Sequence, residues 1–455
     1  MTRPLLRDLY AALAAALLVT VAVLAGRHIQ DSHHTLFVKW PPVLATWYPH
    51  VGPGTPAALL VAAAVVAYGP ALALRLPWRA LLATAWATAT AWIASLALVD
   101  GWQRGIAGRL ATRHEYLQVI DRFDDIPAGL RDFTHHILLE SPDNWPAHVA
   151  GHPPAATLTF VLLDRIGLRG GGWAGVWCVA VGATACVAVL VAVRALAGES
   201  LARRAAPFLV LAPAAVWMGT SADAYFAAVA SWAVALLALA VSGRPATGVP
   251  PLERSREWGR AAAAGLLFGL TCYLSYGLTL VALIGAAVLL LGRRRVRERP
   301  VLLVALLAGL AVVPAAFTLA GFDWWEAYRL LVTRYHQGVG GIRPYGYWVW
   351  ANLACAVLIT GLATAPGLRR TGAVLLRRRT EPPGHVRLAL LVSAALLALL
   401  VADLSGMSKA ETERIWLPFA VWLLPACAFL TRPRAWLATQ AVLALLLNHL
   451  LLTGW

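Results

Sequence analysis

The sequence has little charge for its length. Of 455 residues, 13% are Asp, Glu, Lys or Arg and 60% are hydrophobic, whereas soluble globular proteins have about 25% charged residues. No long stretch is polar enough to fold as a soluble domain. The composition excludes a soluble globular protein and predicts an all-α polytopic membrane protein.

Lysine and acidic residues are scarce as well. Lys39 and Lys409 are the only lysines among 38 basic residues, and 22 acidic residues leave a formal net charge of +16. In a soluble chain this excess would indicate nucleic-acid binding. Here the arginines form short clusters between apolar runs, the pattern of residues that set membrane topology. We therefore expect no nucleic-acid partner.

Cysteine is absent from the polar segments. The five cysteines, Cys178, Cys186, Cys272, Cys355 and Cys427, all fall within apolar runs. This placement indicates neither a disulfide framework nor a cysteine-based metal site. We expect the thiols to be packing residues.

Apolar runs dominate the rest of the chain. A bilayer core about 30 Å thick needs about 20 apolar residues in a helix. By this criterion about thirteen spans are predicted: 9–26, 56–74, 80–99, 172–193, 205–219, 222–242, 260–274, 277–291, 300–320, 345–364, 387–403, 414–431 and 435–453. The apolar segment 153–167 is too short to cross and predicts a short or re-entrant helix.

The basic clusters predict the sidedness of the protein. Cytoplasmic segments carry an excess of Lys and Arg, and the segments assigned inside contain 24 of the 38 basic and 6 of the 22 acidic residues. These are the N-terminus, Arg75 and Arg79, 194–204, 243–260, 292–299, 365–387 and 432–434. The first run lacks a convincing cleavage site and is expected to stay as an anchor. The predicted localisation is a multi-pass plasma-membrane protein with a cytoplasmic N-terminus and any chemistry on the extracytoplasmic face.

The largest outer segment is the loop 100–152. It contains eight of the 22 acidic residues, and loops of this length are usually functional or disordered. Its apolar residues recur at helical spacing, which predicts amphipathic helices on the membrane surface; they are Tyr116, Ile120, Phe123, Leu130, Phe133, Ile137 and Leu138.

Three carboxylates at this face are candidate catalytic bases: Asp100, Glu115 and Asp121. Asp100 ends the third span, and Glu115 follows His114. A carboxylate at a membrane exit can serve as general base toward an acceptor hydroxyl. The ordinary alternative for each is a solvated helix terminus. Asp223, at the start of another span, is a further candidate, for which helix capping is the ordinary alternative.

Two candidates mark helix openings or breaks. His152 precedes Pro153 and Pro154, and proline is favourable in a first helical turn, but helix geometry does not explain the histidine. It is placed to bind a phosphate or orient a carboxylate, or is an interfacial cap. Tyr276 lies in a polar break between apolar runs, and such breaks line cavities in membranes.

The remaining candidates are cationic or acidic groups near late spans. His336 and Arg343 lie in a glycine-containing segment flanked by tryptophans; arginine binds phosphate oxygens, whereas interfacial tryptophans are usually membrane anchors. Lys409, Glu411, Glu413 and Arg414 precede the twelfth span. Charges at a buried helix entrance must be paired or used on a ligand, so a salt-bridged helix start is the alternative there.

The acidic outer loop, the helix opened by His152, and the E-x-E-R motif ending at Arg414 together resemble the class C membrane glycosyltransferases. These multi-span enzymes, which include protein mannosyltransferases and aminoarabinose transferases, use sugars linked to polyprenyl phosphate. RYHQGVGGIRPYGYWVWANLA (334–354) and SKAETERIW (408–416) are most similar to actinobacterial members. The resemblance covers residues 80–431 and implies added N-terminal helices at 1–79 and a final helix at 432–455.

The resemblance implies roles for several candidates. Asp100 would match the base, and Arg414, with Lys409 or Arg343, would neutralise the lipid phosphate. In this sequence Asp100 follows the third span, whereas the matching acid of the family follows the first. This sequence also has no acidic doublet at the position where many members of the family have one. The base therefore remains open between Asp100, Glu115 and Asp121.

The predicted function is sugar transfer from a polyprenyl-phosphate donor to an acceptor hydroxyl on a cell-envelope glycan, lipid or protein, with inversion at the anomeric carbon. The alternatives are a transporter or flippase for lipid-linked sugars, and a binding or scaffold protein. Transporters usually carry mid-bilayer ionisable residues and repeated halves, and no repeat is visible. No cofactor is required by a ligand spacing, and a divalent cation such as Mg²⁺ or Mn²⁺ is left open.

Overall fold

The computed structural model describes residues 3–243 and 251–454. Its longer helices are α1 (Arg3–His33), α2 (Thr55–Arg75), α3 (Trp78–Ala97), α11 (Ala222–Val241), α12 (Pro251–Leu274), α15 (Val301–Leu319), α16 (Trp324–Gln337), α18 (Tyr345–Thr360), α20 (Pro383–Leu404) and α23 (Pro433–Leu450). Over these residues the fold is all-α apart from two strands of three residues, β1 (Ala45–Trp47) and β2 (Leu451–Thr453), which pair antiparallel.

Shorter helices and helical turns complete the fold. They are η1 (Leu98–Asp100), η2 (Gln103–Ala107), η3 (Arg109–Ala111), η4 (Tyr116–Phe123), α4 (Ile126–Asp132), η5 (Phe133–His136), α5 (Ala147–Gly151), α6 (Ala155–Arg165), α7 (Gly170–Gly182), α8 (Thr184–Ala197), α9 (Glu199–Val210), α10 (Ala215–Met218), η6 (Tyr276–Leu280), α13 (Val281–Leu291), α14 (Arg293–Glu298), α17 (Val339–Ile342), α19 (Thr364–Leu376), α21 (Thr412–Ile415), α22 (Leu417–Ala420) and η7 (Leu424–Phe429).

Seven described helices are long and apolar enough to cross a membrane, or eight if α18 and α19, which meet at 103°, form one span. The protein is therefore a polytopic α-helical membrane protein. The count of thirteen is not confirmed. Predicted spans 205–219, 277–291 and 414–431 are interrupted instead: α9 ends before α10, η6 precedes α13, and 412–429 is divided among α21, α22 and η7.

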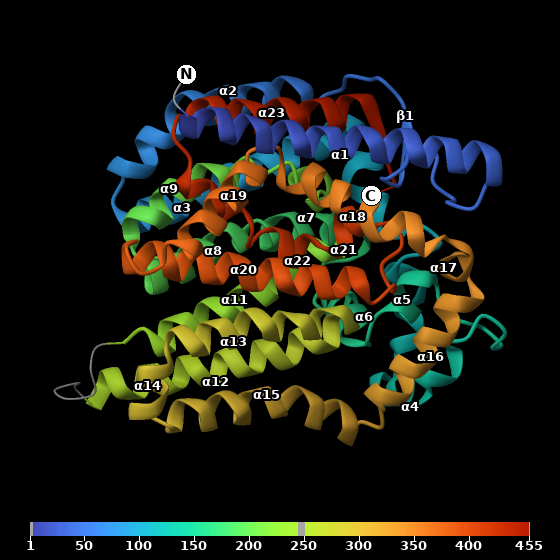
Figure 1. Cartoon of the computed structure of the whole chain (residues 1–455). Helices are drawn as coiled ribbons and strands as arrows, with labels where there is room; N and C mark the ends of the chain where they lie inside the picture. The colour runs from blue at the N-terminus through green and yellow to red at the C-terminus, as the bar shows by residue number, and fades with distance from the viewer. Residues whose placement is uncertain (1–2, 244–250, 455) are drawn as a thin grey trace.

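The long helices lie side by side, and the connecting segments gather at their two ends (Figure 1). Helices α1, α2 and α23 form one flank, and α15 forms the other. Helices α4, α5, α16 and α17 lie together at one end, whereas α14 lies at the opposite end. We call the end that carries α16 and α17 the site end.

Arginines tie together the end opposite the site end. Arg203 donates to the carbonyl oxygens of Ala73 and Leu76, both at 2.8 Å, and Asp8, fully buried, pairs with Arg369 and Arg370 at 2.6 and 2.5 Å. Arg203 thereby joins α9 to the α2–α3 turn, and Asp8 joins the N-terminal helix α1 to α19. These basic segments must lie at the same end of the molecule if they all face the cytoplasm, and these contacts are consistent with that. That this end faces the cytoplasm stays a prediction.

The loop 100–152 folds as consecutive short helical turns, without a long amphipathic helix. Tyr116, Phe123, Leu130, Phe133 and Ile137 are nevertheless buried. The helical spacing therefore identified the apolar residues that pack, but not the length of the helices. The short apolar segment after the loop is α6, with 11 residues.

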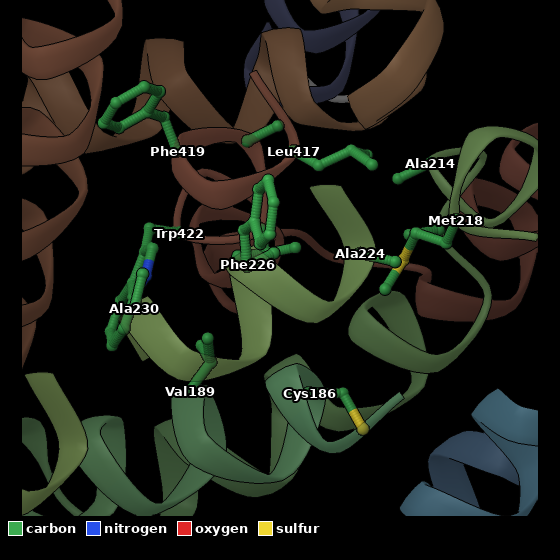
Figure 2. Packing of buried hydrophobic residues seen from close by; sticks show 14 of the residues in the cluster. Cys186, Val189, Ala214, Met218, Ala224, Phe226, Ala230, Leu417, Phe419 and Trp422 are labelled. Carbon is green, nitrogen blue, oxygen red and sulfur yellow. The ribbon is translucent and has the colours of Figure 1, made fainter. Parts of the chain in front are cut away.

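The interior beneath the site end is apolar (Figure 2). Val189 of α8, Phe226 of α11, Leu417 and Trp422 are each completely buried. Cys186 packs in the same cluster, and all five cysteines are free thiols, four of them buried. The cysteines are packing residues, as expected.

Candidate functional site

The E-x-E-R segment enters the site through an unusual backbone. Ala410 and Glu411 both adopt left-handed conformations, with φ of 71° and 62°. For residues with a Cβ this conformation costs roughly 1–2 kcal/mol each, and it turns the chain sharply before α21. The turn places the side chains of Glu411 and Arg414 in contact, at 3.0 Å.

Arg414 is the centre of the site. Its guanidinium is buried and donates to Asp223 of α11 at 2.6 Å, to Glu411 at 3.0 Å and to Nε2 of His148 in α5 at 2.9 Å. Burial alone would lower its pKa, but the carboxylates of Asp223 and Glu411 outweigh burial and the pKa of Arg414 is raised. The guanidinium is a permanent cation at this end of the molecule.

His148 connects Arg414 to Glu115. Its Nδ1 lies 2.8 Å from Oε1 of Glu115, while Nε2 faces Arg414. Because an arginine only donates, Nε2 is the acceptor and the proton of neutral His148 lies on Nδ1. Glu115 is buried, and its Oε2 has no hydrogen-bond partner among the described residues. One carboxylate oxygen thus has no hydrogen bond within the described residues.

His152 packs behind this group. Its Nδ1 lies 2.7 Å from the carbonyl oxygen of His148 and 3.0 Å from the hydroxyl of Tyr116, and its ring contacts Phe226. Burial lowers the pKa of His152 to about 4. The side chain is therefore neutral at neutral pH and supports the backbone of His148.

Arg343 adds a second buried cation. Its Nε donates to the carbonyl oxygen of Leu36 at 3.0 Å, and its Nη1 donates to that of Lys409 at 2.8 Å and lies 3.8 Å from Glu411. Lys409 in turn donates from Nζ to the carbonyl oxygen of Gly340 at 2.9 Å. Glu411 thus lies between two guanidinium groups, which hold its pKa below the usual value although burial opposes ionisation.

Glu413 is completely buried and accepts the backbone N–H of Leu44 at 2.8 Å. Its other oxygen has no hydrogen-bond partner among the described residues. Burial raises the pKa of Glu413 to about 7. We name residues 34–44 the strap: its backbone bonds both Arg343, at Leu36, and Glu413, at Leu44.

Asp100 belongs to a different cluster. Its oxygens lie 3.0 Å from His50, 3.4 Å from Arg104 and 2.9 Å from Arg109. Arg109 also donates to the carbonyl oxygen of Thr453 in β2. Both carboxylate oxygens of Asp100 are engaged by basic side chains, and one of these, Arg109, also binds the C-terminal strand β2.

Three further candidates lie outside the Arg414 network. Asp121 is exposed on η4, and His336 is exposed near the end of α16. Tyr276 is buried against Trp324 and Tyr328 of α16, with ring centroids 5.1 and 5.7 Å away. The structure brings together Glu115, His152, Arg343, Lys409, Glu411, Glu413 and Arg414.

Two side chains of the network received no role from the sequence. Asp223 lies in the first turn of α11, where the helix dipole favours a carboxylate, and it also accepts from Arg414; helix position alone therefore does not account for it. His148 precedes His152 by one helical turn, and this i, i+4 spacing was the available signal. Among the described residues, no group of three or more His, Cys, Asp or Glu is placed to hold a metal ion.

A groove adjoins the network where α1 and α18 diverge. It has a volume of about 590 Å³ and is lined by residues of the α1 end, the strap and the start of α18. Thr35 in its lining precedes Leu36, and Pro344 follows Arg343. The groove therefore lies against the buried Arg343–Leu36 hydrogen bond.

Three solved structures are similar to this fold in part. The oligosaccharyltransferase of Archaeoglobus fulgidus, solved with Zn and sulfate, has a TM-score of 0.42 at 15% identity over 76% of this chain and 48% of that chain. ArnT from Cupriavidus metallidurans, in the apo state, has 0.43 at 16% identity over 73% and 56%. The archaeal oligosaccharyltransferase AglB from Archaeoglobus fulgidus, with an inhibitory peptide and a dolichol-phosphate, has 0.42 at 13% identity over 77% and 49%.

The chain spans about half the length of these solved proteins. No family model and no curated protein matches the sequence. Similarity at this level assigns no family, so the functional conclusion below depends on the residues of the site.

Proposed function

We propose that the protein is a class C-like membrane glycosyltransferase that transfers a sugar from a polyprenyl-phosphate donor to an acceptor hydroxyl on the extracytoplasmic face of the plasma membrane. The observation that supports this most strongly is the buried Arg414, joined through one imidazole to Glu115. A phosphate-binding cation and a carboxylate base held in one hydrogen-bonded network suit displacement at an anomeric carbon bound beside that network.

Glu115 is the proposed base. The acceptor oxygen attacks the anomeric carbon as its proton passes to Glu115, and the bond from that carbon to the phosphate oxygen breaks with its electron pair on the phosphate. The anomeric centre inverts in this single displacement. His148 holds Glu115 in place through its Nδ1 proton.

Arg414, assisted by Arg343, is proposed to stabilise the leaving phosphate. In the structure both guanidinium groups contact Glu411. A phosphate has the same charge sign and the same preference for paired guanidinium donors, so it would compete with Glu411 for them. Lys409, adjacent in the chain to Ala410, supplies a further cation near the same loop.

The test uses the purified protein, a panel of radiolabelled polyprenyl-phosphate sugars and envelope extracts as acceptor. Wild-type protein should transfer label from at least one donor. Glu115→Gln should lower the rate about 10²–10⁴-fold, while Asp121→Asn, a matched change on the exposed face of η4, should leave it within threefold.

Asp100→Asn separates the two remaining bases. We expect its rate to stay within tenfold while its thermal stability falls, because Arg109 loses a partly buried partner. A large rate loss in Asp100→Asn with an unchanged Glu115→Gln rate would identify Asp100 as the base and overturn the assignment. Transport of labelled donor across proteoliposomes without transfer would favour the flippase alternative.

A further inference from the structure

The last turn of α1 is bonded to the strap through one side chain. The carboxamide oxygen of Gln30 accepts the backbone N–H groups of Leu36 and Phe37, both at 3.1 Å. Gln30 is half-buried in the last turn of α1, and the strap turns sharply after it, since His34 has a φ of 53°. Leu36 and Phe37 lie outside the described helices and strands. Gln30 therefore satisfies two backbone donors where the chain leaves the helix.

The peptide unit between Leu36 and Phe37 carries this support to the site. Its N–H, on Phe37, binds Gln30, and its carbonyl oxygen, on Leu36, accepts Nε of Arg343 at 3.0 Å. A trans peptide unit is planar and rigid, and its N–H and C=O point in opposite directions. Gln30 and Arg343 thus bind opposite sides of one rigid group, and the orientation of that group fixes where the acceptor for Arg343 lies.

The loop before α21 holds the other side of the Arg343 guanidinium. Nη1 donates to the carbonyl oxygen of Lys409 at 2.8 Å and lies 3.8 Å from Glu411. One carbonyl of the strap and one of the loop therefore set the plane of the guanidinium fork. Leu36 also packs in one apolar cluster with Ala410, so the strap and the loop are in contact at this point.

Burial makes these bonds hard to replace by water. Leu36 is completely buried, and Arg343 is 7% exposed. A backbone carbonyl displaced in such surroundings leaves Nε of Arg343 without an equivalent acceptor. We therefore expect loss of the Gln30 acceptor to move the Arg343 guanidinium.

We propose that Gln30 is a positioning residue for the transfer reaction: it fixes the Leu36–Phe37 peptide unit, which in turn orients Arg343. The inference depends on the proposed function and adds to it, because it gives α1, outside the core 80–431 implied by the resemblance, a part in the reaction. Negative charge grows on the leaving phosphate as its bond to the anomeric carbon breaks. A misplaced Arg343 therefore lowers kcat more than it weakens donor binding.

Two substitutions separate the acceptor oxygen of Gln30 from its size. Gln30→Met has a similar length but only a weakly accepting thioether, whereas Gln30→Glu keeps an oxygen for both N–H groups. Gln118→Met is the matched control, since Gln118 is an exposed glutamine that also bonds a backbone group, the carbonyl oxygen of Ala111, at 2.8 Å. The full-length proteins are assayed with the radiolabelled donor that wild type uses, and rates are taken per mole of folded protein.

Gln30→Met should lower kcat about 10–10²-fold, with KM for the donor within threefold of wild type. Gln30→Glu and Gln118→Met should keep kcat within threefold. Amide hydrogen exchange should be faster in strap peptides of Gln30→Met and unchanged in those of Gln30→Glu. Unchanged strap exchange or unchanged kcat in Gln30→Met overturns the inference, as does an equal loss of kcat in Gln30→Met and Gln30→Glu.

A double variant tests whether Gln30 acts through Arg343. If it does, Gln30→Met combined with Arg343→Gln should have a kcat within threefold of that of Arg343→Gln alone, because the group being oriented is already absent. If the two single losses multiply in the double variant, Gln30 acts elsewhere and the inference is wrong.

The same assay distinguishes this outcome from failure of the proposed function. If wild type transfers sugar and Gln30→Met does so equally, the positioning role is wrong and the function stands. If no donor of the panel supports transfer by wild type, the function is wrong, and the positioning role is lost with it.

Discussion

At the scale of single residues, Glu413 gives the site a pH dependence. The side chain is completely buried and its pKa is raised to about 7 by burial. Between about pH 4.5 and pH 7, Glu413 therefore stays protonated in the folded state, whereas in the unfolded chain it has released its proton. Since the folded state binds more protons in this interval, stability falls as pH rises from about 4.5 to about 7 and then levels.

Glu413→Gln should remove this dependence, because a neutral amide resembles the protonated acid and its oxygen can still accept the N–H of Leu44. We expect the variant and wild type to have similar stability at pH 5, and the variant to be more stable by about 3 kcal/mol at pH 8. Thermal unfolding in detergent across this range measures the difference. If the stability of the two proteins changed with pH in parallel, the pH dependence would not come from Glu413.

Several residues of the site could be predicted from the sequence because charge is conspicuous in an apolar chain. Arg343, Glu411 and Arg414 were identified on that ground. The contributions of Leu36 and Leu44 could not be predicted. Leu36 acts through its carbonyl oxygen, which every residue has, and Leu44 acts through its N–H, which every residue except proline has. The sequence also could not show that Asp100 and Glu115 belong to different clusters, because each cluster is formed by segments far apart in the chain.

At the scale of elements, Asn352 of α18 holds the loop that precedes α21. Its amide donates to Asp403 at 2.9 Å and to the carbonyl oxygen of Ser408 at 2.6 Å, and its Oδ1 accepts from Thr412 at 3.3 Å. Asn352 and Asp403 are both buried. These bonds fix both ends of the segment that contains Lys409 and Glu411.

Asn352→Leu should destabilise the protein by about 1–3 kcal/mol, because the buried carboxylate of Asp403 loses the hydrogen bond that Asn352 donates. We also expect a higher KM for the donor, because the loop with Glu411 is no longer fixed. Thermal unfolding and donor titration measure the two effects. Asn144→Leu is the control: Asn144 is exposed and its bond to Leu139 should be dispensable. Equal stability of the two variants would count against the role of Asn352 in holding the loop before α21.

Helices α12 and α15 pack through glycines. A Cβ at Gly265 would lie 1.9 Å from the carbonyl oxygen of Leu306, and one at Gly309 would lie 2.0 Å from that of Ala262. Close backbone approach at small residues is a common way for membrane helices to associate. The two helices therefore tolerate no side chain at their crossing.

Gly265→Leu should cost at least about 2 kcal/mol, since the backbones must move apart. Gly259→Leu, in the same helix at a position where a Cβ meets nothing within 4 Å, should change stability little. Unfolding of both variants in detergent gives the comparison. Because leucine favours a helix more than glycine does, a destabilisation of similar size in both would show that the added side chain is unfavourable anywhere on α12, and that the crossing is not responsible.

Long uninterrupted helices such as α11 and α20 could be predicted from hydropathy and length. The interrupted segments could not, because an apolar run has the same hydropathy whether it is one helix or several turns. Pro213 separates α9 from α10, and Pro425 lies in η7 after α22. Within protein, neighbouring groups satisfy the backbone at such breaks, so the sequence does not prevent them.

At the scale of the whole molecule, the predicted sidedness can be tested directly. Four of the five native cysteines are buried, so an introduced cysteine can report accessibility. A membrane-impermeant maleimide applied to intact cells should label Asp143→Cys and should not label Arg378→Cys, both exposed positions, at opposite predicted faces. Labelling of Arg378→Cys in intact cells, with Asp143→Cys protected, would invert the topology and place the site in the cytoplasm.

The pairing of Asp223 with Arg414 has a consequence for biosynthesis. The two residues are 191 positions apart, so α11 reaches the membrane well before the cation that neutralises its acid has been translated. During that interval the carboxylate lacks the guanidinium of Arg414 and must be solvated by water or other polar groups. A nascent chain halted before residue 414 would carry a lasting polar defect at that helix, which membrane quality-control proteases are suited to recognise.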